Sequence, residues 1–154
     1  MSDVLFYHLE NQPLERVLPQ LLEKTVERGW RAVVETAGDE RAAALDALLW
    51  TYRDDSFLPH GVAGDSTDPD QPILITTDEA NANAASVRFF VDRAVPRPGE
   101  AYERIVYLFS GHDPDAVSEA RVAWRALVEG NVLTYWQQDE SGRWEKKATS
   151  GGTP

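Results

Sequence analysis

Three residue types of a hydrolytic triad stand close together in one short segment, as Ser110, His112 and Asp113. Catalysis would require a hydrogen-bonded chain from nucleophile through base to orienting carboxylate, and residues this close in sequence seldom supply one. The segment also lacks the G-x-S-x-G pattern of a nucleophile elbow. A turn followed by a helix explains the same residues better, with Asp113 as the N-cap and Pro114 at the first helical position.

Metal and nucleotide chemistry are disfavoured as well. The three histidines are scattered without metal-ligand spacing, there is no cysteine, and the acidic stretch 65–70 lacks the glycine and terminal glutamate of an EF-hand loop. The first strand-to-helix turn, residues 10–13 (ENQP), has a carboxylate and a proline where nucleotide-binding folds have glycine N–H groups. No GxxxxGK(S/T) motif occurs. We therefore expect no catalytic residues, no metal and no cofactor.

A basic and aromatic group in the last predicted helix is a candidate binding surface. Arg121 and Arg125 are four residues apart and share one helix face, with Trp124 at the neighbouring position. Two guanidinium groups beside an indole suit a ligand that carries both a carboxylate and an aromatic ring. The alternative is a solvated helix face with Trp124 turned into the core.

A second candidate surface lies where an earlier helix ends. Trp50 at the helix exit and Phe57 in the following loop bracket a polar run, 51–56. Exposed aromatic rings at such positions suit docking of a partner, because they offer a large contact area at low entropic cost. The alternative is that both rings cap the core. His60, in the same loop, is expected to fix the loop by hydrogen bonding rather than to act as a base.

The elements that must position these residues follow an α/β pattern. Apolar runs predict strands at 4–9, 30–36, 73–76, 87–91 and 105–109, and helical spacing predicts helices at 13–28, 39–52 and 114–129. The first helix contains Pro19, which should bend it or delay its start. Residues 61–72 are turn formers throughout and predict an exposed loop. Segments 132–138 and 143–147 flank a hairpin turn.

This order predicts one α/β domain with a mainly parallel sheet flanked by helices, Rossmann-like but without a nucleotide-binding loop. We expect the domain to span 1–147, with a flexible tail at 148–154. Its first strand, helix and second strand should form a parallel crossover unit.

Charge restricts the class of partner. The 154 residues include 15 Lys and Arg against 26 Asp and Glu, a net charge of −11. Binding to a phosphate backbone depends on cationic patches, so we expect contacts with proteins rather than direct DNA binding. Neither a signal peptide nor a membrane span is present in the sequence, and the lack of cysteine fits a soluble, cytoplasmic protein.

The segment 45–64, in which LDALLW is followed by FLPHG, resembles the chi subunit of the bacterial DNA polymerase III holoenzyme. The segments VLFYHL at 4–9, RGWR at 28–31 and RVAWR at 121–125 fall in matching order. The resemblance covers most of the chain between residues 4 and 138.

The resemblance implies a non-catalytic adaptor in DNA replication. It would link the clamp-loader complex, through a psi subunit, to the acidic C-terminal tail of single-stranded DNA-binding protein. The resemblance places the tail pocket at Arg121, Trp124 and Arg125. Val117 departs from the family, whose members can carry a lysine there. The segment around Trp50 and Phe57 corresponds to the surface for psi or a competing helicase.

Two other classes of function remain open from the residues alone. One is a nucleotide-dependent α/β enzyme with a non-standard phosphate site, and the other is a generic interaction domain. Binding of nucleotide and binding of an acidic tail peptide separate the three hypotheses.

Overall fold

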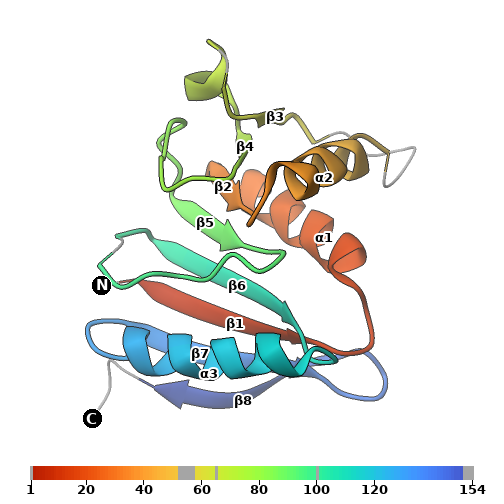
Figure 1. Ribbon diagram of the computed structural model, residues 1–154, viewed down its shortest axis with the longest axis vertical. Coiled ribbons are helices and arrows are strands. Elements are labelled where there is room, and N and C mark those ends of the chain that lie inside the picture. Colours follow the sequence, from red (N-terminus) through yellow and green to blue (C-terminus); the bar gives the residue numbers. More distant parts are fainter. Residues whose placement is uncertain (1, 52–57, 65, 100, 151–154) are drawn as a thin grey trace.

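The computed structural model describes residues 2–51, 58–64, 66–99 and 101–150, which form one sheet with helices on both faces (Figure 1). The strands are β1 (Asp3–Leu9), β2 (Ala32–Glu35), β3 (Gly61–Val62), β4 (Ile73–Thr76), β5 (Val87–Phe90), β6 (Arg104–Ser110), β7 (Val132–Gln138) and β8 (Trp144–Ser150). The helices are α1 (Leu14–Glu27), α2 (Asp39–Thr51) and α3 (Pro114–Leu127), with a 3-10 turn at Asp68–Asp70.

The strand order is β3-β4-β2-β5-β6-β1-β7-β8, and every neighbouring pair is parallel except β7 with β8. The predicted fold class, an α/β domain with a mainly parallel sheet, is confirmed. β1 and β2 run in the same direction, as a crossover unit requires, but β5 and β6 lie between them. β1 lies inside the sheet, between β6 and β7, and not at its edge.

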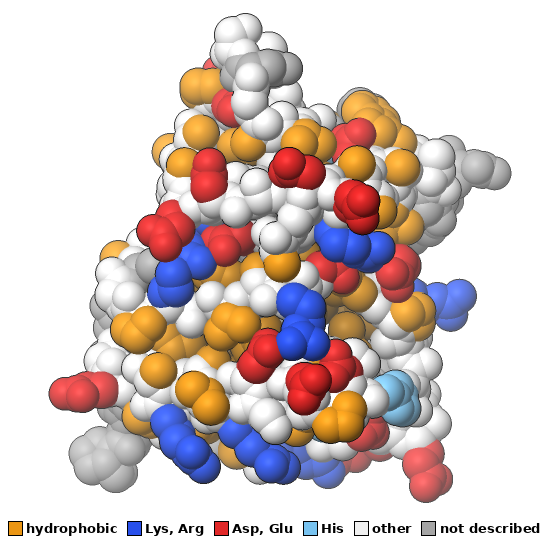
Figure 2. Space-filling view, viewed as in Figure 1, with side chains coloured by type: hydrophobic (Ala, Val, Ile, Leu, Met, Phe, Trp, Pro, Cys, Tyr) orange, Lys and Arg blue, Asp and Glu red, His pale blue; other side chains and the backbone are white. Residues whose placement is uncertain are grey.

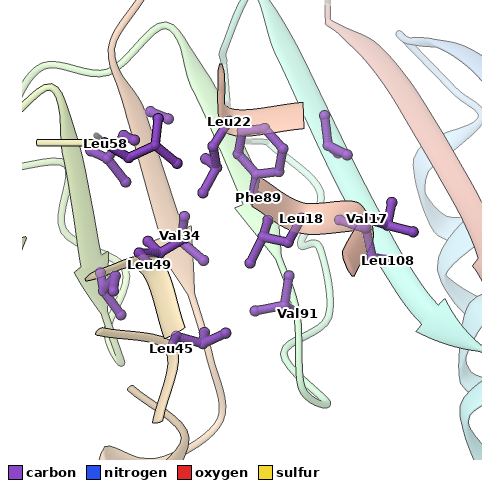
Figure 3. Packing of buried hydrophobic residues seen from close by; sticks show 14 of the residues in the cluster. Val17, Leu18, Leu22, Val34, Leu45, Leu49, Leu58, Phe89, Val91 and Leu108 are labelled. Atoms are coloured by element: carbon purple, nitrogen blue, oxygen red, sulfur yellow. The ribbon is translucent and has the colours of Figure 1, made fainter. Parts of the chain in front are cut away.

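Two hydrophobic cores lie on the two faces of the sheet, because successive side chains of a strand point to opposite sides. One core packs α1 and α2 against strands β2, β4, β5 and β6. The labelled residues of Figure 3 show the part of this core that comes from α1, α2, β2, β5 and β6. The other packs α3 against β1, β6 and β7. In β5, Phe89 belongs to the first core and Phe90 to the second, and both are buried. Figure 1 shows α1 and α2 grouped beside the β2–β5 half of the sheet and α3 over the β1–β7 half.

Three local expectations are corrected by the structure. The segment 61–72 is not entirely loop, since Gly61 and Val62 pair with β4 as a short edge strand and a 3-10 turn follows. Helix α1 begins at Leu14 and continues through Pro19, so of the two expected effects of Pro19, a bend or a delayed start, the delayed start is wrong. β8 continues to Ser150, three residues into the stretch expected to be a tail, because it pairs with β7 along its length. Residues 151–154 lie outside the described part of the chain.

Candidate functional site

Helix α3 begins as the sequence predicts, with Asp113 as N-cap and Pro114 at the first position. The Asp113 carboxylate accepts hydrogen bonds from two backbone N–H groups of the first turn, at 3.0 and 3.3 Å. Small side chains at helical spacing bury one face of the helix against the sheet, namely Ala116, Ala120 and Ala123, followed by Leu127. The short alanines bring the helix axis close to the sheet and fix which residues point outward.

Arg121 and Arg125 point outward on α3, one turn apart, and both are exposed. Within the described part of the chain, neither guanidinium group has an ion pair or a side-chain hydrogen bond. Val122 lies beside them with 63% of its surface exposed. Figure 2 shows Lys and Arg side chains along the lower edge of the molecule, over α3, with acidic side chains gathered above them. We call Arg121, Val122 and Arg125 the α3 patch.

Trp124 lies under the α3 patch rather than beside it. Its ring meets Phe6 edge-on at a centroid distance of 5.1 Å and Tyr135 at 6.1 Å, so the indole is partly buried in the second core. Val117 packs against the same core. Burial raises the pKa of the Tyr135 phenol, and the positive charge of Arg121 opposes that rise, which places Arg121 close to the edge of the aromatic cluster. This arrangement agrees with the alternative, since the arginines form a solvated face and the indole of Trp124 is turned toward the core. Binding of a ligand by these residues stays a prediction.

Val122 is the residue of this surface that sequence reasoning missed. Its position is on the polar face of an amphipathic helix, where an apolar side chain breaks the pattern. This exposed apolar position in the helical pattern could have identified Val122 from the sequence.

Trp50, in the last turn of α2, has 51% of its surface exposed, and its ring contacts the ring of His60 at a centroid distance of 4.5 Å and an angle of 44°. His60 is buried and fixes the loop, as expected: its Nδ1 donates to the Leu58 carbonyl at 2.6 Å, and its Nε2 lies 3.0 Å from Oδ1 of Asp46. Phe57 lies outside the described residues. Of the two predicted docking aromatics, Trp50 therefore lies at the surface, against the buried ring of His60.

A pocket of about 510 Å³ lies where β1 and β6 end. These neighbouring strands continue into α1 and α3, which lie on opposite faces, and such a switch point is where open α/β sheets bind ligands. Five carboxylates and one arginine are among its lining residues, the arginine being Arg93. Arg93 is held by Glu119 and, at 2.9 Å, by Asp113. The excess of carboxylates repels phosphate, in agreement with the absence of glycine from the first turn.

The serine, histidine and aspartate at this edge do not form a triad. The His112 ring donates from Nε2 to the Glu10 carbonyl at 2.8 Å, and Ser110 Oγ accepts from the backbone N–H of His112 at 3.2 Å. A Cβ on Gly111 would lie 2.0 Å from Nε2 of His8 in β1, so a larger residue at this position would require the His8 ring to move. These residues hold the two loops together.

A buried network of charged side chains lies near the end of β2. Arg88 of β5 is fully buried and donates to Oε1 of Glu35 at 2.6 Å, and Arg97 donates to the same carboxylate at 2.7 and 2.8 Å. Further donors of Arg88 reach the carbonyls of Asp78 and Ala80. Burial alone would raise the pKa of Glu35, but hydrogen bonds and charges from Arg97 and Arg88 outweigh it and hold the pKa below its usual value.

Among the described residues, no group of three or more His, Cys, Asp or Glu side chains is arranged to hold a metal ion. In the same part of the chain, no helix is both long and apolar enough to cross a membrane.

Comparison with known proteins gives a consistent result. The sequence model of the family described as "DNA polymerase III chi subunit, HolC" matches residues 1–132. A protein of Rickettsia prowazekii (strain Madrid E), "Probable DNA polymerase III subunit chi", is 33% identical over 87 residues, which are 56% of this chain and 53% of that protein. The chain thus matches about half the length of this relative.

A solved structure, the C-terminal part of the Fun30 ATPase domain, superposes with a TM-score of 0.48 and 16% identity, covering 75% of this chain and 48% of that one. At that level of similarity it carries no argument about function. The family match, by contrast, extends from β1 through α3 and includes Trp50 and the α3 patch. The chain belongs to the DNA polymerase III chi subunit family.

Proposed function

We propose that this chain is a non-catalytic adaptor of the DNA polymerase III holoenzyme. It connects the clamp-loader complex, through a psi-like subunit, to the acidic C-terminal tail of single-stranded DNA-binding protein. Membership of the chi family supports this proposal, and so does the lack of a triad or a phosphate site among the described residues.

The observation that carries the proposal is the α3 patch. In a chain with net charge −11, two exposed guanidinium groups remain without a carboxylate partner in the described part of the chain, one turn apart on the same helix. A short acidic peptide offers the carboxylates that these groups lack. Exposed Val122 and the partly buried indole of Trp124 supply apolar surface for an aromatic residue at the end of such a peptide.

Fluorescence anisotropy with a labelled tail peptide tests the proposal. Charge-assisted hydrogen bonds are strong, so Arg125→Ala and Arg121→Ala should each weaken binding about ten- to hundredfold. Removal of the terminal aromatic residue from the peptide should weaken binding by a similar factor. Arg16→Ala is the matched control, because Arg16 is also exposed and without an ion pair in the described part of the chain but lies on α1. Wild-type affinity in both α3 variants would contradict the assignment of this patch.

The second docking surface is proposed at Trp50 and Phe57. Trp50 is exposed and its ring is held by buried His60, so it can bind a partner with little loss of side-chain freedom. Trp50→Ala should weaken a psi-like or helicase partner by about 2 kcal/mol, while the unfolding midpoint stays unchanged. If the same substitution strongly destabilises the fold, the ring belongs to the core and the assignment is wrong.

The competing hypothesis of a nucleotide-dependent enzyme makes the opposite prediction for the pocket at the ends of β1 and β6. Its five carboxylates disfavour a triphosphate. Calorimetry should therefore detect no binding of ATP or GTP at micromolar concentrations, and micromolar binding would favour the enzyme over the adaptor.

A further inference from the structure

One side of the β6-β1-β7-β8 half of the sheet is only partly covered. The side chains of β1 and β7 that point toward α3, such as Val4, Phe6 and Leu133, are fully buried. Their alternating neighbours Tyr7 and Trp136 point to the other side and are only partly buried. On that side α1 packs on β2 and β6, and α2 packs on β3 and β4. We call this side of β6, β1, β7 and β8 the open face.

A pocket of about 320 Å³ lies where the open face meets the end of α1. Its apolar walls are contributed by α1 and by strands β1, β5 and β6, and three aromatic rings line it, those of Tyr7, Trp30 and Phe89. Three cations from different parts of the chain also line it, and these are Lys24, Arg28 and Arg104. Glu27 is the one carboxylate among the lining residues. This pocket therefore has the opposite charge balance to the pocket at the ends of β1 and β6.

The cations of this pocket lack anionic partners. In the described part of the chain, none of Lys24, Arg28 and Arg104 has an ion pair or a side-chain hydrogen bond. The guanidinium groups of Arg28 and Arg104 lie over the ring of Trp30, at 5.2 and 5.5 Å from its centre. The Nε atom of Arg104 is buried and has no acceptor among the described residues. Buried donors are nearly always satisfied by a protein group or an ordered water, so we expect an oxygen atom from outside the described residues at this donor.

Helix electrostatics explain only part of this arrangement. Lys24 and Arg28 lie at the end of α1, where the helix dipole favours cations. Arg104 begins β6, far away in sequence, and the dipole does not account for it. Arg104 and Tyr7 line the same pocket. Burial raises the pKa of the Tyr7 phenol, and the charge of Arg104 opposes that rise.

The alternation of rings and cations continues across the open face. Tyr7 is opposite Trp136 in the sheet register, and Trp136 is opposite Lys146. The Lys146 Nζ atom lies 5.7 Å from the centre of the Trp136 ring, and Trp144 meets Tyr7 edge-on at 4.9 Å. A row of aromatic side chains interleaved with cations thus extends from the pocket to β8.

We propose that the open face binds single-stranded nucleic acid, with bases against the aromatic rings and phosphates at Lys24, Arg28, Arg104 and Lys146. Sheet faces that present aromatic rings among cations bind unpaired bases in this manner. An acidic peptide would satisfy the cations, but it would leave the repeated rings without a role. The proposal is independent of the adaptor function, since it uses neither the α3 patch nor Trp50.

The overall net charge of −11 predicts repulsion of nucleic acid, and the open face is a local exception to it. At an ionic strength of 0.1 M the Debye length is about 10 Å, so exposed carboxylates at the other end of the strands are largely screened from this face. Binding of nucleic acid should therefore be measured at that ionic strength, where the local cations of the open face determine the affinity.

Anisotropy with a labelled oligothymidylate of about 15 nucleotides tests the proposal. We expect a dissociation constant of about 10⁻⁴ to 10⁻⁶ M for the wild type, a range typical of binding without sequence preference. Arg28→Ala and Arg104→Ala should each weaken binding about fivefold or more, and should lower the dependence of affinity on salt. Arg16→Ala on the same helix and Arg125→Ala on the opposite face are controls that should bind like the wild type.

Two further measurements distinguish base stacking on the aromatic rings from binding by charge alone. Poly-glutamate of equal length should bind at least about tenfold more weakly than the oligonucleotide, because it offers charge without bases. In a Trp50→Phe, Trp124→Phe background, the oligonucleotide should quench the fluorescence of the remaining tryptophans, all of which are on or next to the open face. Arg28 is exposed, so Arg28→Ala remains informative even if Arg104→Ala fails to fold.

Three outcomes would each overturn the proposal. They are no binding of oligothymidylate at millimolar concentration, equal binding of poly-glutamate, and wild-type affinity in a folded Arg28→Ala variant. None of them bears on binding of the tail peptide to the α3 patch, so failure of this proposal and failure of the adaptor function are distinguishable.

Discussion

Arginines at the two ends of the parallel strands are used in opposite ways. Where the strands end, carboxylates bind arginines: Glu35 at the end of β2 binds Arg97 and the side chain of Arg88, which reaches it from the second position of β5, and Asp113 binds Arg93. Where the strands begin, Arg28 and Arg104 have no ion pair within the described part of the chain. We call these the carboxyl edge and the amino edge.

The difference shows that net charge alone does not predict which surfaces attract anions. The chain has 26 acidic residues for 15 basic ones, enough to neutralise every cation. Instead, carboxylates gather around the pocket at the carboxyl edge, while the guanidinium groups of the α3 patch and the open face have no ion pair with any described residue. Paired arginines stabilise the fold, and unpaired arginines are available to a partner. Substitutions in the two groups of arginines should therefore have different effects on stability and on binding.

The largest expected effect is on the buried pair at the carboxyl edge. Glu35→Ala leaves the charge of fully buried Arg88 without its carboxylate, so the free energy of unfolding should fall by about 3–5 kcal/mol. Urea unfolding measures this loss. Arg41→Ala, which breaks a more exposed ion pair with Asp92, should cost less than about 1 kcal/mol. Similar losses in the two variants would remove the distinction between structural and surface pairs.

A smaller effect is expected where the loops of the carboxyl edge meet. Gly111→Ala places a methyl group against the ring of His8 and should lower the free energy of unfolding by about 1–3 kcal/mol, the usual cost of overpacking. Gly38→Ala is the matched control, because a Cβ there meets no atom within 4 Å. If the two substitutions have equal effects, the close approach of the loops is not a constraint.

Acid should weaken the carboxyl edge selectively. Because the pKa of Glu35 is lowered in the folded state, its contribution to stability is complete above its ordinary pKa of 4.5 and is lost as the pH falls through the lowered value. The unfolding midpoint of the wild type should therefore fall with acidification more than that of Glu35→Gln. Parallel curves for the two proteins would show that Glu35 is not the group that titrates.

The smallest expected effect concerns the arginines of the α3 patch. They are exposed and unpaired in the described part of the chain, so Arg121→Ala and Arg125→Ala should change the free energy of unfolding by less than about 0.5 kcal/mol. Thermal unfolding followed by circular dichroism measures this change. A loss above 1.4 kcal/mol, about tenfold in the folding equilibrium, would assign these residues to the fold instead of a partner.

Local sequence patterns predicted most of the individual helices and strands, because each pattern depends only on the residues of one element. The apolar run Ile73–Thr76 forms β4 with the expected bounds, and Asp113-Pro114 begins α3 as expected. β3 was missed because a two-residue strand is too short to show a period of two. The order of the strands also depends on contacts between distant segments, which the pattern within each segment does not contain.

The candidate sites divide in the same way. Helical spacing predicted that Arg121 and Arg125 share a face, since both belong to one helix. The inward position of Trp124 depends on Phe6 and Tyr135, which come from two other strands. The pocket at the amino edge needs residues from α1, β1, β5 and β6 together. The positive charge of this pocket could therefore not be predicted from the sequence without the strand order.

The place of β1 between β6 and β7 has a consequence for synthesis on the ribosome. Ser2 bonds to Asn131, 129 residues later, and β1 pairs with β7 along most of its length. Until β7 leaves the exit tunnel, the nascent chain presents one side of β1 as an unpaired edge, with Val4 and Phe6 still lacking part of their cover. Such edges invite pairing with other chains. Translation must therefore run almost to the end of the described residues before the hydrophobic centre of the sheet is covered on both sides of β1.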